Sequence, residues 1–340
     1  MKDSHIQQHD STTKGIRHFV GRTLLFALVA CVGYILLLCL FGDLGWARTG
    51  NFKAGNQGHI FTRMKEAREY HDIDVLFLGS SHCYRTFDTR FYEANGIHCY
   101  NLGSSNQSPI QTRVLLDAYL DSLHPKFVVF EVHDDIMRND GVESAVDMLI
   151  NVPITAEASK MAWGLKNMKV LNTWAYSLYN QKVMHRLDNF VEDSVIFNFR
   201  HVRGGFLEND SCNFVKRNYA RKDLTIQPKQ LKALKQCLAM LDEHNIPYLL
   251  VETQDALQYR KSVKNHEWFE KQMSALGPYY YEVLPLVDTL HFFDSYHFNK
   301  EGVRIFNEHF INILRKQLDK RVPAFGKQAE PPTPISTQNQ

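Results

Sequence analysis

One uninterrupted apolar segment near the amino terminus constrains this chain more than any other feature. Residues 23–42 read TLLFALVACVGYILLLCLFG and contain no charged side chain. As an α-helix, a segment of this length measures about 30 Å, which is the thickness of the hydrocarbon core of a bilayer. A buried helix of a soluble domain would normally keep a polar stripe. We therefore predict a single transmembrane helix over residues 23–42.

Two kinds of processing segment are alternatives to an uncleaved anchor. A cleaved signal peptide has a shorter apolar core and a cleavage site of small residues. Residues 28–31 (LVAC) resemble a lipoprotein processing box, but the chain stays apolar as far as Phe41, well beyond Cys31. A processed lipoprotein would turn polar after the cysteine, so the sequence favours an uncleaved anchor.

Basic residues on the two sides of the segment indicate its orientation. Lys14, Arg17 and Arg22 precede it, whereas Arg48 and Lys53 follow it. The side richer in Lys and Arg stays in the cytoplasm. We therefore expect a cytoplasmic polar tail over residues 1–22, an anchor in the inner (cytoplasmic) membrane, and the rest of the chain on the outer, periplasmic side.

The composition of the whole chain is that of an ordinary folded protein. Hydrophobic residues make up 44% of the chain and charged residues 22%, which excludes a disordered protein. The 39 basic residues face 37 acidic ones, so nothing indicates a nucleic-acid partner held by bulk charge.

Short apolar runs alternate with amphipathic stretches after the anchor. Each run is too short for a typical helix and is bounded by turn residues or charges, which predicts strands. Pro109 and Pro228 begin two of the amphipathic stretches, as proline does in a first helical turn. Strands alternating with helices predict an α/β domain with a parallel sheet and helices on both faces. The predicted strands lie at residues 74–78, 97–102, 127–132 and 246–251, with a weaker one at 280–283.

The same pattern divides the chain into segments. We predict a juxtamembrane linker over residues 43–62 and one domain over residues 63–320. A long aromatic stretch over about residues 140–223 interrupts the alternation and predicts an insertion of helices and loops. The proline-rich residues 321–340 predict a disordered tail.

Two polar motifs lie where chemistry is expected. Residues 78–82 (LGSSH) follow the first predicted strand, and ligands of parallel sheets bind at the carboxyl ends of strands. Asp294 and His297 precede the last predicted helix. His297 could accept the proton of a serine, while Asp294 could orient its ring and stabilise the imidazolium.

A metal site is an alternative interpretation of the second motif. His291, Asp294 and His297 recur at intervals of three, and His133 and Asp134 follow the third strand. Imidazole and carboxylate groups ligate several transition metals. A serine mechanism requires neither a metal nor a cofactor, and we expect none.

Together these motifs resemble those of the SGNH (GDSL-like) hydrolase family. Gly-x-Ser follows the first strand, residues 100–106 (YNLGSSN) resemble the family's second block, and Asp-x-x-His precedes the last helix. The resemblance covers roughly residues 72–318. It implies a three-layer α/β/α domain resembling flavodoxin and a catalytic triad in which Ser81 is the nucleophile, His297 the base and Asp294 its orienting partner.

The resemblance also implies donors for an oxyanion. The backbone N–H of Ser81 would be one. The second-block glycine aligns with Asn106, which tolerates a left-handed backbone, or else with Gly103. The family's third block supplies an asparagine side chain that is missing here, where His133 could donate instead.

These inferences lead to one functional hypothesis and two alternatives. Anchored relatives include alginate O-acetylation proteins and the D-alanine transfer protein of teichoic acids. The resemblance thus implies a serine esterase or O-acyltransferase, with acetyl as the acyl group, acting on an envelope polysaccharide or glycolipid. Trp163 and Trp174 of the insertion could stack on sugars or pack in a core. A degenerate scaffold for a membrane acyltransferase and a metal-dependent hydrolase are the alternatives.

Overall fold

The computed structural model describes residues 2–44, 52–55, 58–196, 198–209 and 214–319, with side chains from residue 15 onward. The predicted tail over residues 321–340 and the basic residues Lys14 and Arg48 of the orientation argument lie outside this description, Lys14 by its side chain only.

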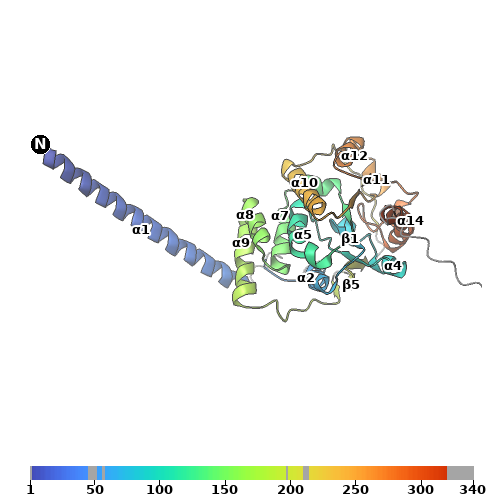
Figure 1. The fold of residues 1–340 in the computed structure, drawn as a ribbon, viewed down its shortest axis with the longest axis horizontal. Coiled ribbons are helices and arrows are strands. Elements are labelled where there is room, and N and C mark those ends of the chain that lie inside the picture. Colours follow the sequence, from blue (N-terminus) through green and yellow to red (C-terminus); the bar gives the residue numbers. More distant parts are fainter. Residues whose placement is uncertain (1, 45–51, 56–57, 197, 210–213, 320–340) are drawn as a thin grey trace, which may run out of the picture.

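The apolar segment forms part of a long helix that leaves the folded domain. Helix α1 (Lys2–Asp43) projects from one side of the molecule (Figure 1). Within Gly15–Asp43, the most apolar 18-residue stretch has a mean hydropathy of 2.9 and is exposed. Among the described helices, this one alone is long and apolar enough to cross a membrane.

The carboxyl-terminal end of α1 is fastened to helix α9 (Met168–Leu178). Tyr34 donates a hydrogen bond to Asn172 (2.8 Å). The carboxylate of Asp43 accepts hydrogen bonds from Tyr176 (3.1 Å) and Tyr179 (2.9 Å), and both guanidinium nitrogens of Arg186 also donate to it. The helix and the domain are therefore joined by packed polar contacts in addition to the chain between them.

The domain is built on a five-stranded parallel sheet, which confirms the predicted fold class. The strand order is β2-β1-β3-β7-β8. Counted along the chain this is 2-1-3-4-5, the order of flavodoxin-like doubly wound sheets. All five strands lie at or within two residues of the predicted apolar runs. They are β1 (Val75–Leu78), β2 (Cys99–Asn101), β3 (Phe127–Glu131), β7 (Tyr248–Val251) and β8 (Tyr279–Tyr280).

Helices cover both faces of the sheet and make the predicted three layers. Because side chains alternate along a strand, Leu76 and Leu78 pack into one core while Val75 and Phe77 pack into the other. The first core lies under α5 (Pro109–Leu123) and α10 (Pro228–Glu243), each beginning at its predicted proline. The second lies under α14 (Lys300–Asp319), α3 (Ser81–Tyr84) and α4 (Thr89–Ala94).

The other helices are short or belong to the insertion. They are α2 (Ile60–Glu66), the 3-10 turn η1 (Ala67–Glu69), α6 (Asp134–Arg138), α7 (Val142–Asn151), α8 (Ala156–Gly164), the π-helical η2 (Tyr179–Val183), α11 (Leu257–Arg260), α12 (His266–Ser274) and α13 (Asp288–His291). The five described cysteines are free thiols, Cys31, Cys39, Cys83, Cys99 and Cys237.

The insertion contains a small antiparallel sheet that the sequence analysis did not predict. Its strands are β4 (Val195–Ile196), β5 (Phe199–Val202) and β6 (Phe206–Asn209). Gly204 and Gly205 have positive φ angles (90° and 88°) and form the turn between β5 and β6. A Gly-Gly pair between two apolar runs is a hairpin signal. The prediction of a helical insertion over residues 140–223 is therefore wrong for residues 195–209.

Arg63 of α2 ties this hairpin to the edge of the main sheet. It is fully buried, and its guanidinium donates to the carbonyl oxygens of Gly205 (2.8 Å), Asn101 (3.1 Å) and Gly103 (2.5 Å). The amide of Asn101 in turn donates to the carbonyl of Gly204 (2.8 Å). The hairpin therefore continues the hydrogen bonding of edge strand β2 and is held over the carboxyl ends of the strands.

We expect Arg63→Met to lower the free energy of unfolding by on the order of 3 kcal/mol, because buried carbonyl groups lose their donors. Lys65→Met, an exposed charge removal on the same helix, is the matched control and should change the free energy by less than about 0.5 kcal/mol. Chemical unfolding of the full chain in detergent, followed by circular dichroism, measures both. Equal stabilities for the two variants would contradict this role of Arg63.

Candidate active site

The candidate nucleophile lies at the sharp turn where β1 ends and α3 begins. Gly79 has a φ of 146°, and a Cβ atom there would lie 2.5 Å from Oε2 of Glu131, so only glycine fits. Ser80 caps α3, and its Oγ accepts a hydrogen bond from the amide of His82 (3.2 Å). Ser81 is the first residue of α3 and remains partly exposed at the carboxyl end of the sheet.

Glu131, at the end of the neighbouring strand β3, stabilises this turn by hydrogen bonding. Its Oε2 accepts hydrogen bonds from both the amide (2.7 Å) and the hydroxyl (2.8 Å) of Ser80. The side chain is fully buried, and its Oε1 has no partner among the described residues. Burial raises the pKa of Glu131 to about 7.

The structure brings Ser81, His297 and Asp294 into one line of hydrogen bonds. Nε2 of His297 lies 2.8 Å from Oγ of Ser81, and Nδ1 lies 2.8 Å from Oδ2 of Asp294. The three residues come from opposite ends of the domain sequence, as the two motifs predict. Their order and distances are those of a nucleophile, a base and the group that orients the base.

The loop before α14 fixes the position of His297. The amide of Phe293 donates to the carbonyl of His297 (2.8 Å), which closes the loop. Asn299 accepts hydrogen bonds from the amides of Glu301 and Gly302 (3.0 Å each) and thereby caps α14. Residues 294–302 (DSYHFNKEG), which contain the Asp-x-x-His motif, therefore form a single turn into the last helix.

The charges around the base favour its neutral form. Burial and the nearby guanidinium of Arg85 lower the pKa of His297 below its ordinary value. Burial opposes ionisation of Asp294, but hydrogen bonds from His297 and from two backbone amides outweigh it and hold the pKa of Asp294 at about 2. At neutral pH the pair is therefore a neutral imidazole beside a carboxylate, which is the state that can accept a proton.

A row of buried imidazoles continues from the base into the core. The ring of His82 lies 5.0 Å from that of His297 and stacks on that of His133 at 3.9 Å. His82 is also hydrogen-bonded through Nδ1 to Oγ1 of Thr253 (3.0 Å). Burial, followed by the two neighbouring imidazoles, lowers the pKa of His82 well below its ordinary value. His82 is therefore a neutral packing partner of the base.

The structure narrows the predicted set of oxyanion donors. The amide of Ser81 donates to no atom in the described part of the chain. The amide of Asn106 also lacks a partner among those residues, and its φ of 49° is left-handed, which suits its place at a glycine position. The hydroxyl groups of Ser105 and Tyr84 are hydrogen-bonded to each other (3.0 Å). This bond holds the loop that contains Asn106 against α3.

Gly103 and His133 are not free to serve as oxyanion donors. The amide of Gly103 donates to Oδ1 of Asn101 (3.0 Å). Nε2 of His133 is hydrogen-bonded to Asp255 (3.1 Å), and Nδ1 accepts the amide of Asp135 (3.3 Å). These two predictions are wrong because both groups already have partners within the protein.

The predicted set of metal ligands is not assembled. Asp294 and His297 bind each other, and Nδ1 of His291 accepts the amide of Val287 (2.8 Å). Two other sets of three ligating side chains do lie close together among the described residues, namely His82, His133 and Asp255, and His133, Asp134 and Asp135. Lys222 neutralises part of the second set, since its Nζ lies 3.3 Å from both Asp134 and Asp135.

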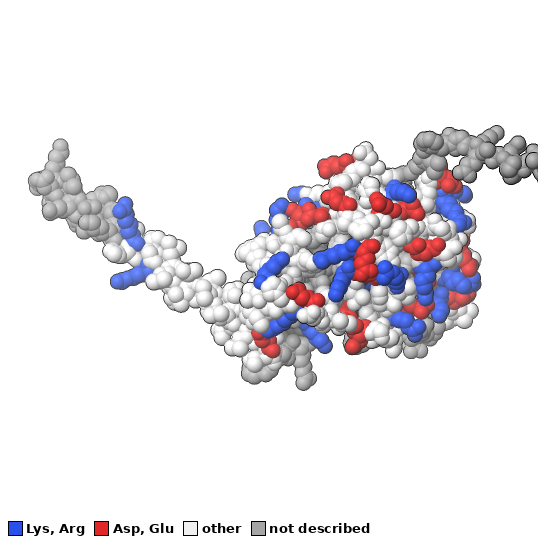
Figure 2. All heavy atoms as spheres, turned by 60° about the horizontal axis from the view of Figure 1, so that its bottom comes forward, with Lys and Arg blue, Asp and Glu red and all other residues white. Residues whose placement is uncertain are grey.

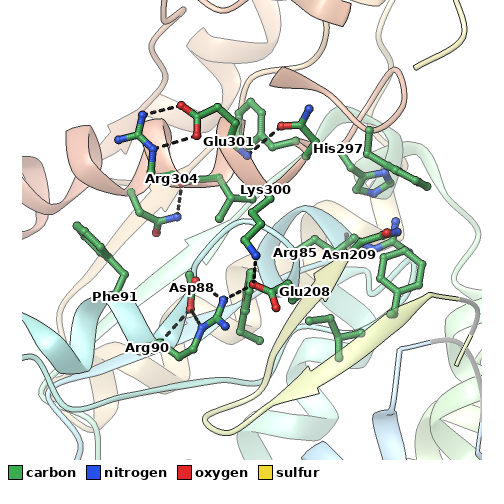
Figure 3. A pocket seen from close by; sticks show the side chains of 18 of the residues that line it. Arg85, Asp88, Arg90, Phe91, Glu208, Asn209, His297, Lys300, Glu301 and Arg304 are labelled. Atoms are coloured by element: carbon green, nitrogen blue, oxygen red, sulfur yellow. Dashed lines mark hydrogen bonds and ion pairs between the residues drawn. The ribbon is translucent and has the colours of Figure 1, made fainter. Parts of the chain in front are cut away.

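A cavity of about 430 Å³ adjoins His297 (Figure 3). The insertion hairpin supplies Phe199 and Phe206 to its wall, and the loop before α14 supplies Phe293 and Phe298. Trp163 and Trp174 are not among its lining residues. Trp174 instead donates to Oγ of Ser159 (3.0 Å) and packs edge-on against Trp163 (5.6 Å). The insertion therefore contributes to a pocket beside the base, but through phenylalanines.

No family model matches the sequence, and no curated protein matches it. Two solved structures are similar, a presumed acylhydrolase from Bacteroides fragilis NCTC 9343 and a GDSL-like lipase from Bacteroides thetaiotaomicron VPI-5482. Each is 12% identical, with a TM-score of 0.27, over 78% of this chain and 99% of the solved chain. Similarity at this level assigns no role to any residue. The roles of the site residues therefore follow from the sequence and geometry of this chain.

The sequence did not predict the roles of several residues at the site, namely Glu131, Arg85, His82 and Asp255. Glu131 carries a usable signal, since an acidic residue inside an apolar strand is rarely buried without a purpose. No sequence signal distinguishes Arg85, His82 and Asp255, because their roles arise from contacts between distant segments.

The raised pKa of Glu131 predicts a pH-dependent stability. Because its pKa is about 7 in the folded chain and 4.5 ordinarily, its contribution is fully present below pH 4.5 and is lost as pH rises through 7. This loss amounts to about 3 kcal/mol, since one pKa unit corresponds to about 1.4 kcal/mol. Glu131→Gln should remove that part of the decline in unfolding free energy between about pH 4.5 and pH 7.

Glu143→Gln, on the exposed surface of α7, controls for the loss of one acidic residue. Thermal unfolding midpoints of the wild type and both variants across this pH range measure the effect. Parallel curves for the wild type and Glu131→Gln would contradict the assignment.

Proposed function

We propose that this chain is a membrane-anchored SGNH-type serine esterase or O-acyltransferase. The observation that carries the proposal is the line of hydrogen bonds from Ser81 through His297 to Asp294, at the carboxyl end of a flavodoxin-like sheet. The Gly-x-Ser and Asp-x-x-His motifs resemble the first and last blocks of that family; the first motif supplies Ser81, and the second supplies Asp294 and His297.

The proposed reaction proceeds through an acyl-serine intermediate. Oγ of Ser81 attacks the ester carbonyl while Nε2 of His297 takes its proton, and Asp294 stabilises the imidazolium. The tetrahedral intermediate then expels the alcohol, which leaves with the proton from His297, so that the acyl group remains on Ser81. Attack by water would complete hydrolysis, and attack by a sugar hydroxyl would complete transfer.

Two backbone amides would stabilise the developing oxyanion, those of Ser81 and Asn106. Neither has an acceptor within the described chain. The family's third, side-chain donor has no counterpart here, because His133 is bonded to Asp255. Loss of one such donor typically lowers the rate by about 10²–10³. A slow hydrolase of this kind is compatible with transfer to a positioned acceptor.

We place the catalytic domain at the periplasmic face of the inner membrane. The length and apolarity of α1 support a membrane span, and the basic residues before it, among them Arg17 and Arg22, support a cytoplasmic amino terminus. The contacts of Asp43 with α9 and Arg186 support a domain held close to the bilayer.

We infer that the substrate is an envelope polysaccharide or glycolipid and that the acyl group is acetyl. Support comes from the anchor and from the resemblance to alginate O-acetylation proteins and to the D-alanine transfer protein of teichoic acids. Under this proposal a membrane acyltransferase is the partner that supplies the acyl group. The competing proposal, a catalytically inactive scaffold for such a partner, is favoured by the missing third oxyanion donor.

Ser81→Ala should lower the turnover of a chromogenic acetyl ester by about 10⁶ in kcat, and Asp294→Asn by about 10⁴. Ser105→Ala, a serine of the neighbouring loop, is the matched control and should retain activity within about tenfold. The full-length chain in detergent is assayed with and without a chelator.

The outcomes separate the three functions. Turnover that survives chelation and requires Ser81 supports the serine mechanism. Turnover abolished by the chelator but retained in Ser81→Ala would support a metal-dependent hydrolase instead. No turnover by the wild type would support the scaffold.

The pH profile of kcat/KM tests the state of the base. Because burial and Arg85 lower the pKa of His297, activity should fall only when pH drops below the ordinary histidine value of about 6.5. Arg85→Gln should move this acid limb to higher pH. An acid limb that lies above pH 7 in the wild type, or is unmoved in the variant, would contradict this electrostatic assignment.

A further inference from the structure

The cavity beside His297 combines apolar walls with a cluster of basic side chains. Its volume of about 430 Å³ lies within the range of small-molecule sites. Besides the phenylalanines, it is lined by Arg85, Arg90, Lys300 and Arg304. A basic cluster of this kind either forms ion pairs within the protein or binds an anion from outside.

Three of these four cations are paired with carboxylates (Figure 3). Arg90 binds Asp88 and Glu208, each at 2.8 Å. Lys300 lies 3.5 Å from Glu208. The guanidinium of Arg304 binds Glu301 and Glu308, each at 2.6 Å. Their charges are therefore balanced within the protein.

Arg85 differs from the other three. In the part of the chain that the structure describes, it has neither a carboxylate partner nor a hydrogen-bond acceptor for its side chain, and its Nε is buried. The guanidinium instead lies over the ring of Phe199, 4.2 Å from the centroid. Stacking holds the planar group in place and leaves its N–H donors without acceptors.

The position of Arg85 relates it directly to the proposed catalytic residues. Its amide donates to the carbonyl of Ser81 (3.2 Å), one turn earlier, so the two side chains project from the same short helical turn. Arg85 and His297 both line the cavity, and the charge of Arg85 is felt at His297. Figure 3 shows both at the same end of the pocket.

We propose that Arg85 binds an anionic group of the substrate, a carboxylate or a phosphate, in this cavity. The proposal rests on the function proposed above and adds to it a substrate class, an ester whose alcohol carries a negative charge close to the acylated oxygen. A guanidinium fork matches either oxyanion through two parallel N–H···O bonds. The phenylalanines would cover the apolar face of the same unit.

The charge distribution on the domain surface bears on how the protein would select an anionic substrate through Arg85. On the face in Figure 2, acidic and basic side chains are interspersed over the folded domain. The formal net charge of the chain is only +2. Among the described residues that line the cavity, Arg85 is the cation without a carboxylate partner, and under this proposal it recognises the anionic substrate.

Matched acetate esters test this proposal on the full-length chain. They are 4-acetoxybenzoate, its neutral methyl ester, and 4-acetoxyphenyl phosphate, assayed at pH 8 so that His297 is neutral in every variant. Wild type should show a lower KM for at least one anionic ester than for the methyl ester. Arg85→Gln should raise that KM about tenfold and leave the KM of the methyl ester within about twofold, as expected for one charge-assisted hydrogen-bonded pair.

Two further variants sharpen the comparison. Arg85→Lys keeps the charge without the planar fork and should give an intermediate KM. Arg315→Gln removes an exposed cation of α14 that binds only Asn95 among the described residues, and it should leave the preference for the anionic ester unchanged. An independent measurement needs no variant, since benzoate should inhibit hydrolysis of the methyl ester by the wild type more strongly than benzamide does.

The outcomes distinguish this proposal from the one on which it rests. Turnover of all three esters with equal KM, or an equal effect of Arg85→Gln on charged and neutral esters, would overturn the anion site and leave the esterase intact. No turnover of any ester would contradict the proposed function and this inference with it. A preference for only one of the two anionic esters would identify the anion as carboxylate or phosphate.

Discussion

The buried contact between Glu131 and Ser80 is the interaction on which the rest of the site depends. It joins the ends of the two central strands, β1 and β3, and takes both hydrogen-bond donors of the residue before the candidate nucleophile. Gly79 permits this contact because any Cβ would collide with the carboxyl group. With Ser80 held in this way, α3 begins at Ser81, and its hydroxyl and amide face the edge of the sheet where His297 arrives.

A second constraint brings the insertion to the same place. Arg63 fastens the Gly204-Gly205 turn to the edge strand β2, so the hairpin strands β5 and β6 lie beside the loop of His297. An insertion that is remote in sequence thereby supplies Phe199, on which Arg85 stacks. The hairpin also packs on α3 itself, since Phe199 and Leu207 share a buried cluster with Tyr84. The binding surface and the turn at Ser81 are therefore in direct contact.

The sequence predicts the scaffold and the three reactive side chains because each depends on local signals. Apolar runs mark the buried strands, and the motifs at Ser81 and His297 stand at a strand end and a helix start, where parallel topology brings them together. The oxyanion donors and the pocket could not be predicted in the same way. His133 is occupied by Asp255 from the loop after β7, a pairing between distant segments that leaves no trace in a single sequence. Gly103 is occupied by the nearby side chain of Asn101, a contact set by the conformation of the loop.

Covalent labelling measures the reactivity of the Ser81 hydroxyl independently of any substrate. The full-length chain is treated with a serine-reactive phosphonate, digested, and analysed by mass spectrometry. We expect an adduct on Ser81 and none on Ser80, whose hydroxyl donates to Glu131, and loss of the adduct in His297→Asn. Absence of an adduct on Ser81, or equal labelling of the two serines, would contradict the proposed role of Ser81 as the nucleophile.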